Sequence, residues 1–248
     1  MNLTPIEAVS RSDKGLVREV NEDSVAAMPD FGLVVLADGM GGYNSGEIAS
    51  QVAVETIAAY LMPVLGSVEE VGAPLVDAVD AANESIFAAI DENARFEGMA
   101  TTVVLGVFGE RMLHYAHVGD SRIYRLRDDR LDRLTRDHSM IQELVDQGMF
   151  ESMEEAHEAG VRNNVLTRGL GVDQQLEVDT ADIQIKTGDL FLFCSDGLSN
   201  MVSDHVMEKI LSASDQSIES KTDQLLALAL ENGGLDNVSL VLVQPQVG

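Results

Sequence analysis

The amino-acid sequence predicts an α+β fold in which helices cover the outer faces of one or two antiparallel sheets. Short β-branched or aromatic runs alternate with stretches of helical periodicity, and no change in composition marks a linker between them. Two of the runs are joined by a connection too short for a parallel crossover, and the helical stretches come in pairs. These observations indicate one domain over residues 1–248 and argue against a doubly wound parallel sheet.

The predicted strands are apolar runs bounded by Gly, Asp or Asn. They are residues 31–37 (FGLVVLA), 101–108 (TTVVLGVF), 112–118 (MLHYAHV), 190–194 (LFLFC) and 238–243 (VSLVLV). Only the short connection around Gly109 and Glu110 separates the second run from the third, and this is the length of a hairpin turn. We therefore expect these two strands to pair antiparallel.

The predicted helices are stretches in which apolar residues recur at helical spacing. The first covers residues 45–61, where Asn44 and Glu47 are placed to act as the N-cap and the answering acid of a capping box. The second is marked by apolar residues from Leu75 to Ile90, and further helices are expected near residues 140–147, 204–211 and 220–231. Between about residues 139 and 164 the apolar density falls and the acidic density rises, which predicts a surface insertion able to act as a flap.

Composition and charge exclude several classes of protein. Asp and Glu outnumber Lys and Arg by 42 to 16, a formal charge of −26, so nucleic acid and anionic membranes are not expected partners. The single cysteine, Cys194, cannot form an internal disulfide, and there is no Cys/His spacing typical of structural zinc. No signal peptide and no apolar run of membrane-spanning length is evident, so we expect a cytoplasmic protein.

Four aspartates stand at the ends of predicted strands. Asp38, Asp120 and Asp196 follow strands, whereas Asp236 precedes one, and in an antiparallel sheet the end of one strand adjoins the start of its neighbour. Each one alone is most simply a turn residue, but four at corresponding ends predict a cluster at one edge of the fold. A set of oxygen ligands without Cys or His favours Mg²⁺ or Mn²⁺ over zinc or copper.

An arginine and two further acids lie near the start of the chain. Glu22 and Asp23 in isolation would be solvated loop acids, and Arg18 alone would be a surface cation. Beside an acid cluster, however, a guanidinium can hold a phosphate in a bidentate manner while metal ions neutralise its other oxygens. The sequence therefore predicts phosphate chemistry.

These residues carry a family resemblance that extends from about residue 6 to residue 243. The ordered motifs are RxxNED (18–23), LADGMGG (36–42), HVGDSR (117–122), LTRDHS (134–139), LTRGLG (166–171), CSDGL (194–198) and GGLDNV (233–238). Together they resemble the metal-dependent serine/threonine protein phosphatases of type 2C, or PPM type. The match is closest to the short bacterial members, which consist of the catalytic domain alone.

The resemblance implies a four-layer α/β/β/α sandwich with a binuclear metal centre at one edge. Asp38 would bridge both ions, Asp196 and Asp236 would complete the first, and Glu22 with the Gly39 carbonyl would hold the second. Asp23 would orient metal-bound water, and Arg18 would bind the substrate phosphate. In similar bacterial members a third, weaker ion is held by residues matching Asp120 and Asp196, and their flap matches residues 139–164.

The mechanism that follows is direct hydrolysis by a hydroxide bridging two metal ions, with no phosphoenzyme. The animal enzymes have a histidine at the position of Met40 that is thought to protonate the leaving group, and methionine has no proton to give. Water on the third ion and, less favourably, Tyr43 are the remaining candidates for the general acid. Cys194 lies in an apolar strand without a basic phosphate-binding loop, so it is expected to be a buried structural thiol.

Two histidines, His117 and His138, stand in or beside these motifs. His117 alternates within a strand, as a core histidine or one that supports a site would. His138 could cap the helix that follows it or support the site, and the sequence does not distinguish these roles.

The leading function is dephosphorylation of phosphoserine and phosphothreonine in proteins, with a cognate serine/threonine kinase as the opposing partner. The enzyme is expected to be a monomer. The expected cofactors are Mn²⁺ or Mg²⁺, two in the central site and a third bound more weakly. One alternative is a metal phosphohydrolase that acts on a small metabolite, because selectivity lies outside the metal site. The other is a pseudoenzyme that binds a phosphoprotein or metal without turnover, which the intact acids and Arg18 disfavour.

Overall fold

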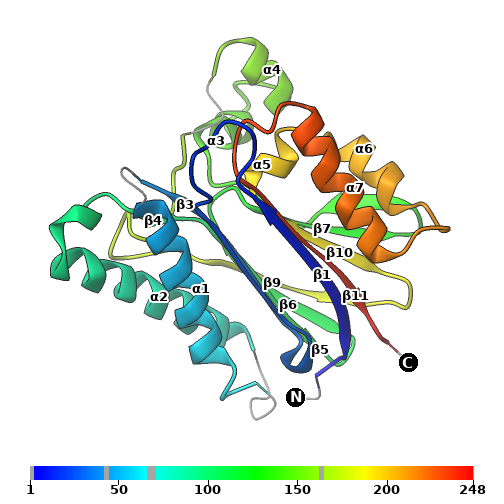
Figure 1. Cartoon of the computed structure of the whole chain (residues 1–248), viewed down its shortest axis with the longest axis horizontal. Coiled ribbons are helices and arrows are strands. Elements are labelled where there is room, and N and C mark those ends of the chain that lie inside the picture. Colours follow the sequence, from blue (N-terminus) through cyan, green and yellow to red (C-terminus); the bar gives the residue numbers. More distant parts are fainter. Residues whose placement is uncertain (1–2, 42–44, 66–70, 162–164, 248) are drawn as a thin grey trace.

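The computed structural model describes residues 3–41, 45–65, 71–161 and 165–247. Within them two antiparallel sheets lie face to face and helices cover the outer face of each (Figure 1). This arrangement confirms the predicted α+β fold of two antiparallel sheets flanked by helices. No helix in the described part of the chain is both long and apolar enough to cross a bilayer.

The first sheet joins strands from the beginning, middle and end of the chain, in the order β1-β11-β10-β7-β8. Its strands are β1 (Ile6–Asp13), β7 (Arg122–Arg127), β8 (Arg130–Arg133), β10 (Leu190–Cys194) and β11 (Val238–Pro245). β1 pairs with β11 along its whole length, from Ile6 opposite Pro245 to Asp13 opposite Val238.

The second sheet has the order β2-β3-β5-β6-β9, and the short β4 pairs with the end of β3. Its strands are β2 (Asp23–Met28), β3 (Leu33–Met40), β4 (Ala100–Thr101), β5 (Val103–Gly109), β6 (Met112–Val118) and β9 (Asp179–Gln184). β5 and β6 pair as the expected hairpin, from Val103 opposite Val118 to Gly109 opposite Met112.

The helices form two outer layers and a separate cap. α1 (Ser45–Leu61) and α2 (Gly72–Glu92) pack on the second sheet, whereas α6 (Asp204–Leu211) and α7 (Ile218–Glu231) pack on the first. α3 (Met140–Asp146), α4 (Met153–Glu158) and α5 (Asp196–Ser199) gather at one end of the sandwich, beside the loop that joins β1 to β2 (Figure 1). Two 3₁₀ turns, η1 (Pro29–Phe31) and η2 (Ala94–Phe96), complete the described elements.

The central strands are apolar without interruption because both of their faces are covered. Every residue of β5 and of β10 is buried, between the helices on one side and the facing sheet on the other. The layer between the sheets contains Phe108, Phe191 and Phe193, with Phe108 and Phe191 in edge-to-face contact at 5.5 Å. This packing fixes the ends of the strands that carry the aspartates.

The strand boundaries differ most from the sequence prediction at two places, and β11 also extends two residues further, to Pro245. The run predicted at 31–37 begins at Leu33, because Phe31 closes the turn η1 and Gly32 has a left-handed conformation with φ of 56°. The run predicted at 101–108 is divided into β4 and β5 at Thr102, whose side chain bonds to the backbone of Asp38. The expected cap residue Asn44 lies outside the described residues.

Candidate active site

An acid-lined cavity of about 440 Å³ opens at the end of the sandwich where α3 and α5 lie. Its polar wall is formed by one cation and five carboxylates: Arg18, Glu22, Asp38, Asp120, Asp196 and Asp236. Its apolar wall includes Met40, Val165, Leu166 and Val172. The four aspartates expected at corresponding strand ends thus line one pocket.

Asp38 lies near the end of β3. In the β2–β3 ladder it stands directly opposite Asp23. Its backbone is held by Thr102, whose amide donates to the Asp38 carbonyl at 2.9 Å and whose Oγ1 accepts from the Asp38 amide at 3.1 Å. Asp23 does not line the cavity: it is buried behind Asp38 and accepts a hydrogen bond from Ser195 Oγ at 2.9 Å.

Asp196 and Asp236 lie at adjoining ends of two neighbouring strands. Asp196 begins α5 directly after β10, and Asp236 precedes β11, the antiparallel neighbour of β10. A Cβ on Gly197 would collide with the carbonyl of Asn237, so a glycine there lets the two segments approach closely. The second sheet contributes Asp120 in the same way, because it follows β6.

Asn237 organises the loop that carries Arg18 and Glu22, and the sequence analysis did not identify it. Its Oδ1 accepts from the Glu22 amide at 2.8 Å, and its Nδ2 donates to the carbonyls of Lys14 and Val20, each at 2.9 Å. The residue is 5% exposed. Its place directly after Asp236 in the GGLDNV motif is the signal that could have found it.

Arg18 forms an ion pair with Asp236 at the mouth of the cavity. The distance from Nη2 to Oδ2 is 2.7 Å, and the two side chains are 49% and 37% exposed. The hydrogen bond to Asp236 raises the pKa of Arg18, and the charges of Asp236, Glu22 and Asp38 add to this effect. The pocket therefore already attracts a cation.

The carboxylates are crowded enough to change their acidity. Burial raises the pKa of Asp38 well above its ordinary value, and the charges of Asp23, Asp196, Asp120 and Asp236 raise it further. Burial is also the first cause for Asp120 and Asp23, whose pKa values rise to about 8 and about 7. The pKa values of Asp196 and Glu22 are raised too, again mainly by burial.

Crowded, buried oxygen donors of this kind suit a hard divalent cation. Without one, the carboxyl groups repel one another and hold protons, as the raised pKa values indicate. In addition, Asp23 Oδ1 is buried and has no hydrogen-bond partner in the described structure. The residues present therefore fit Mg²⁺ or Mn²⁺ better than a softer metal.

The base of the predicted flap forms the apolar side of the cavity. The Met140 amide donates to the Val165 carbonyl and the Thr167 amide donates to the His138 carbonyl, each at 2.9 Å. These bonds hold Val165 and Leu166 beside the acids, and α3 and α4 lie beyond them. The last residues of the predicted flap, 162–164, and Tyr43 lie outside the described part of the chain.

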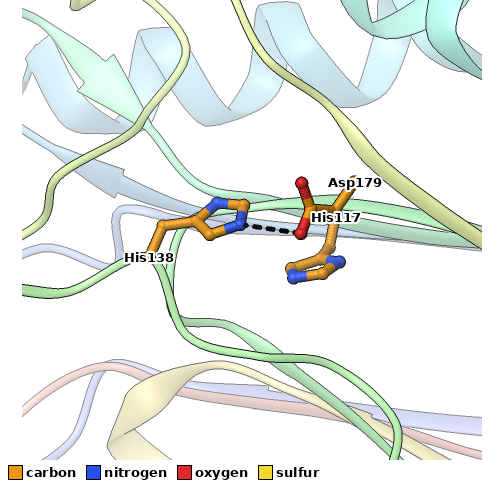
Figure 2. Close-up of side chains that lie close together, drawn as sticks. All are labelled: His117, His138 and Asp179. Carbon is orange, nitrogen blue, oxygen red and sulfur yellow. Dashed lines mark ion pairs between the residues drawn. The ribbon is translucent and has the colours of Figure 1, made fainter. Parts of the chain in front are cut away.

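A second group of titratable side chains, His117, His138 and Asp179, lies beside the turn at Gly119, the residue before Asp120 (Figure 2). Their ligand atoms are all within 4.8 Å of one another, but three of the four ring nitrogens face other groups: His117 Nε2 faces the Arg136 carbonyl at 2.9 Å, and both nitrogens of His138 have contacts of their own. The Gly119 amide donates to His138 Nδ1 at 3.1 Å, so a neutral ring carries its hydrogen on Nε2, which faces Asp179 Oδ2 at 3.4 Å. A hydrogen on Nε2 and the nearby guanidinium of Arg168 both oppose metal binding at this cluster.

His138, His117 and Cys194 are all buried. Ser139 caps α3, since its side chain accepts from the Gln142 amide, so His138 is not the cap. His117 is buried, and burial lowers its pKa. Cys194 is a buried free thiol whose pKa is raised to about 12, chiefly by burial, as expected for a structural residue.

Comparison with known proteins agrees with this geometry. The family model of protein phosphatase 2C matches residues 16–231. The serine/threonine phosphatase stp of Listeria monocytogenes is 35% identical over 244 residues, which are 96% of each chain. The crystal structure of the Mycobacterium tuberculosis serine/threonine phosphatase PstP superimposes with a TM-score of 0.89 at 38% identity, covering 97% of this chain and 98% of that one. A structure of the PstP catalytic domain in complex with two manganese ions has a TM-score of 0.86 at 37% identity, covering 96% and 97%.

Proposed function

This chain belongs to the protein phosphatase 2C family and is a metal-dependent serine/threonine protein phosphatase, and we propose that the acid-lined cavity is its catalytic centre. One observation carries the proposal: five carboxylates with a single arginine at the mouth line one cavity. A site of this kind can hold cations and a phosphate together. Its substrates are phosphoproteins, and the reaction is hydrolysis of their phosphoserine and phosphothreonine esters.

The carboxylates of the cavity would hold the cations. Asp38 would be shared by two central ions, with Asp196 and Asp236 as further ligands of one and Glu22 and the Gly39 carbonyl as further ligands of the other. Asp120, with Asp196, would hold a third and weaker ion. Mn²⁺ and Mg²⁺ are the candidate cations because all of these donors are oxygens.

Bound cations would supply a hydroxide from a water shared between them and would neutralise the phosphate oxygens. Arg18 would move from Asp236 to the substrate phosphate, because a carboxylate that binds a cation no longer needs the guanidinium as its partner. Asp23 would orient the attacking water from behind Asp38, an assignment supported by its unpartnered Oδ1.

The leaving group needs a proton from a source other than Met40. Met40 lines the cavity but has no titratable atom. A water on the third ion is the donor we favour, and Tyr43 is the alternative. The remaining proposals are a single catalytic domain with a flap at about residues 139–164, a cognate serine/threonine kinase that opposes the enzyme, a monomer, and a cytoplasmic location.

The direct test is metal-dependent release of phosphate from a phosphothreonine peptide. Protein stripped by a chelator should be inactive, and Mn²⁺ or Mg²⁺ should restore turnover. Ca²⁺ should support little, because its looser coordination holds the attacking water poorly. Nucleotides and sugar phosphates assayed in parallel provide the comparison with small substrates. Full activity in excess chelator would exclude this mechanism.

A further inference from the structure

We propose that His138 is a positioning residue, which holds the turn at Gly119 in the orientation that lets Asp120 bind a metal ion. The inference rests on the proposed function in one respect, since it takes Asp120 as a ligand of the third ion. His138 itself does not touch that ion. It acts through the backbone that precedes Asp120.

His138 bonds to both backbone polar groups of Gly119, its amide and its carbonyl. Its amide donates to the Gly119 carbonyl at 2.9 Å, and its ring Nδ1 accepts from the Gly119 amide at 3.1 Å. The second bond is buried. Because a backbone amide can only donate, Nδ1 must be the unprotonated nitrogen of the ring.

The turn at Gly119 has a conformation that favours glycine, and a residue with so much backbone freedom is held in one orientation by its bonds to neighbours. Its φ is +103°, and a Cβ built there would lie 2.6 Å from the Thr102 side chain. Ser121, the residue after Asp120, forms a hydrogen bond between its Oγ and Thr102 Oγ1 at 2.7 Å. Thr102 in turn is bonded to the backbone of Asp38. Asp120 is therefore tied to Asp38 on one side and to His138 on the other.

The ring of His138 is itself fixed from two directions, as Figure 2 shows in part. It stacks on His117, with centroids 4.8 Å apart and planes 19° from parallel. Its Nε2 faces Asp179 Oδ2 at 3.4 Å, and Arg168 Nη1 donates to the other oxygen of that carboxylate at 3.1 Å. Asp179 thus favours the tautomer with hydrogen on Nε2, which leaves Nδ1 free to accept from Gly119.

Two amide substitutions separate this role from general packing. In His138→Asn the side-chain oxygen can take the place of Nδ1 and still accept from the Gly119 amide. In His138→Gln the longer side chain can reach Asp179 in the place of Nε2 but leaves the Gly119 amide without its acceptor. We therefore expect His138→Asn to keep Mn²⁺ binding close to wild type and His138→Gln to weaken it.

The measurement is calorimetric titration of Mn²⁺ into the metal-free, full-length protein, with phosphatase assays as a second readout. His138→Gln should raise the dissociation constant of the weakest Mn²⁺ site by about tenfold or more, as loss of a residue that orients a ligand does in other metal sites. His138→Asn should change it by much less than the roughly tenfold that is the lower end of such effects. The two tighter sites should be unchanged in both variants. Equal losses in Asn and Gln would overturn the proposal.

His114 provides a matched control, because it joins β6 and β9, the two strands that carry His117 and Asp179. It lies on β6 and contacts Asp182 of β9 at 2.7 Å, a His–Asp contact like that of His138 but remote from the cavity and exposed. His114→Gln should leave every Mn²⁺ constant unaltered. A change equal to that of His138→Gln would mean that any weakening of this sheet loosens the site, and it would reject a specific role for His138.

Asp120→Asn distinguishes failure of this inference from failure of the proposed function. If Asp120→Asn does not weaken any Mn²⁺ site, the third-ion assignment is wrong. If Asp120→Asn weakens the site and His138→Gln does not, only the positioning role is wrong. Should the His138 variants fail to fold, ¹⁵N NMR of the metal-free wild-type protein still decides the matter, because the proposal requires His138 to be protonated on Nε2 and not on Nδ1.

Discussion

Asp38 is the residue on which the proposed site depends most. Four other aspartates raise its pKa, and its backbone is bonded to Thr102 at both the amide and the carbonyl. A residue held so firmly in such an unfavourable charge environment destabilises the metal-free fold, while a bound cation would reverse that effect. Stability and activity should therefore respond in opposite directions when its charge is removed.

Asp38→Asn should lower phosphatase activity by roughly three orders of magnitude, because it removes the anion that would bridge two cations. The metal-free variant should unfold at the same urea concentration as wild type or a higher one, since the repulsion is relieved. Steady-state assays with Mn²⁺ and urea denaturation in chelator measure the two effects. Retained activity together with unchanged Mn²⁺ affinity would return Asp38 to the role of a turn residue.

Arg18→Ala should act mainly on substrate binding. The loss of a charge-assisted contact of roughly 1.5 to 3 kcal/mol corresponds to an increase in the Michaelis constant of about 10- to 150-fold. Arg11→Ala is the control, because Arg11 pairs with Asp223 and Glu219 on α7, in the same sheet layer as the Arg18 loop but outside the cavity. A Michaelis constant that stays the same in Arg18→Ala would contradict the assignment.

At the scale of single residues, the sequence was informative where a charge stands beside a turn. Asp38, Asp120, Asp196 and Asp236 could be predicted to converge because strand ends meet at one edge of an antiparallel sheet. The contacts of Thr102 and Asn237 could not, since they are hydrogen bonds to backbone groups far away in the sequence, although the GGLDNV motif marks the position of Asn237 itself. No pattern of hydrophobicity or charge reports such bonds.

Among the elements, the apolar interior strands were predictable, whereas the edge strands and the interior strand β7 were not. β10 and β11 are continuous apolar runs because helices and the facing sheet cover them. β1 and β9 lie at sheet edges and expose many of their side chains, so their sequences, IEAVSRSD and DTADIQ, have no apolar run. β7 (RIYRLR) alternates arginine with apolar residues, and its charges pair with acids such as Asp137 and Asp189 only in the folded protein.

The loop between β1 and β2 illustrates how an element without regular structure becomes rigid. Asn237 makes three hydrogen bonds to its backbone, and the Leu16 amide donates to the Gly234 carbonyl at 2.8 Å. The loop is thereby fixed to the start of β11. Arg18 and Glu22 inherit their positions from these bonds.

Asn237→Ala should therefore weaken both metal and substrate binding, although its side chain is assigned to neither. Loss of its buried hydrogen bonds should cost about 1 to 3 kcal/mol of stability and raise both the Michaelis constant and the Mn²⁺ dissociation constants. Asn232→Ala is the comparison, because Asn232 makes one exposed bond, to the Met201 carbonyl. Unaltered metal and substrate binding in Asn237→Ala would show that the loop is held by other contacts.

For the whole molecule, the excess of acid extends from the surface into the cavity. The chain carries a formal charge of −26, and five of its acids line a single cavity. The raised pKa values of Asp23 and Asp120 mean that the folded, metal-free protein binds more protons than the unfolded chain between the ordinary carboxyl pKa of 3.8 and about 8. Stability must fall with rising pH over that interval, because the slope follows the difference in bound protons.

In chelator, the free energy of unfolding should accordingly decrease from about pH 4 toward about pH 8, as the stabilisation present at low pH is lost through the raised pKa values. Saturating Mn²⁺ should oppose this decrease, since cations bind the deprotonated carboxylates. Urea denaturation at several pH values, with chelator and with Mn²⁺, measures both slopes. Asp120→Asn removes one titrating group and should flatten the slope in chelator; an equal slope would mean that these acids do not titrate as described.

The position of β11 has a consequence for how the protein is made. β11 lies between β1 and β10, so the strand translated first in this sheet has no partner until the strand translated last has emerged from the ribosome. Contacts of such long sequence separation form late and slowly. Asp236 lies two residues before β11, so its carboxylate joins the cavity in the same step that closes the sheet. A nascent chain therefore cannot act on phosphoproteins before β11 has emerged from the ribosome.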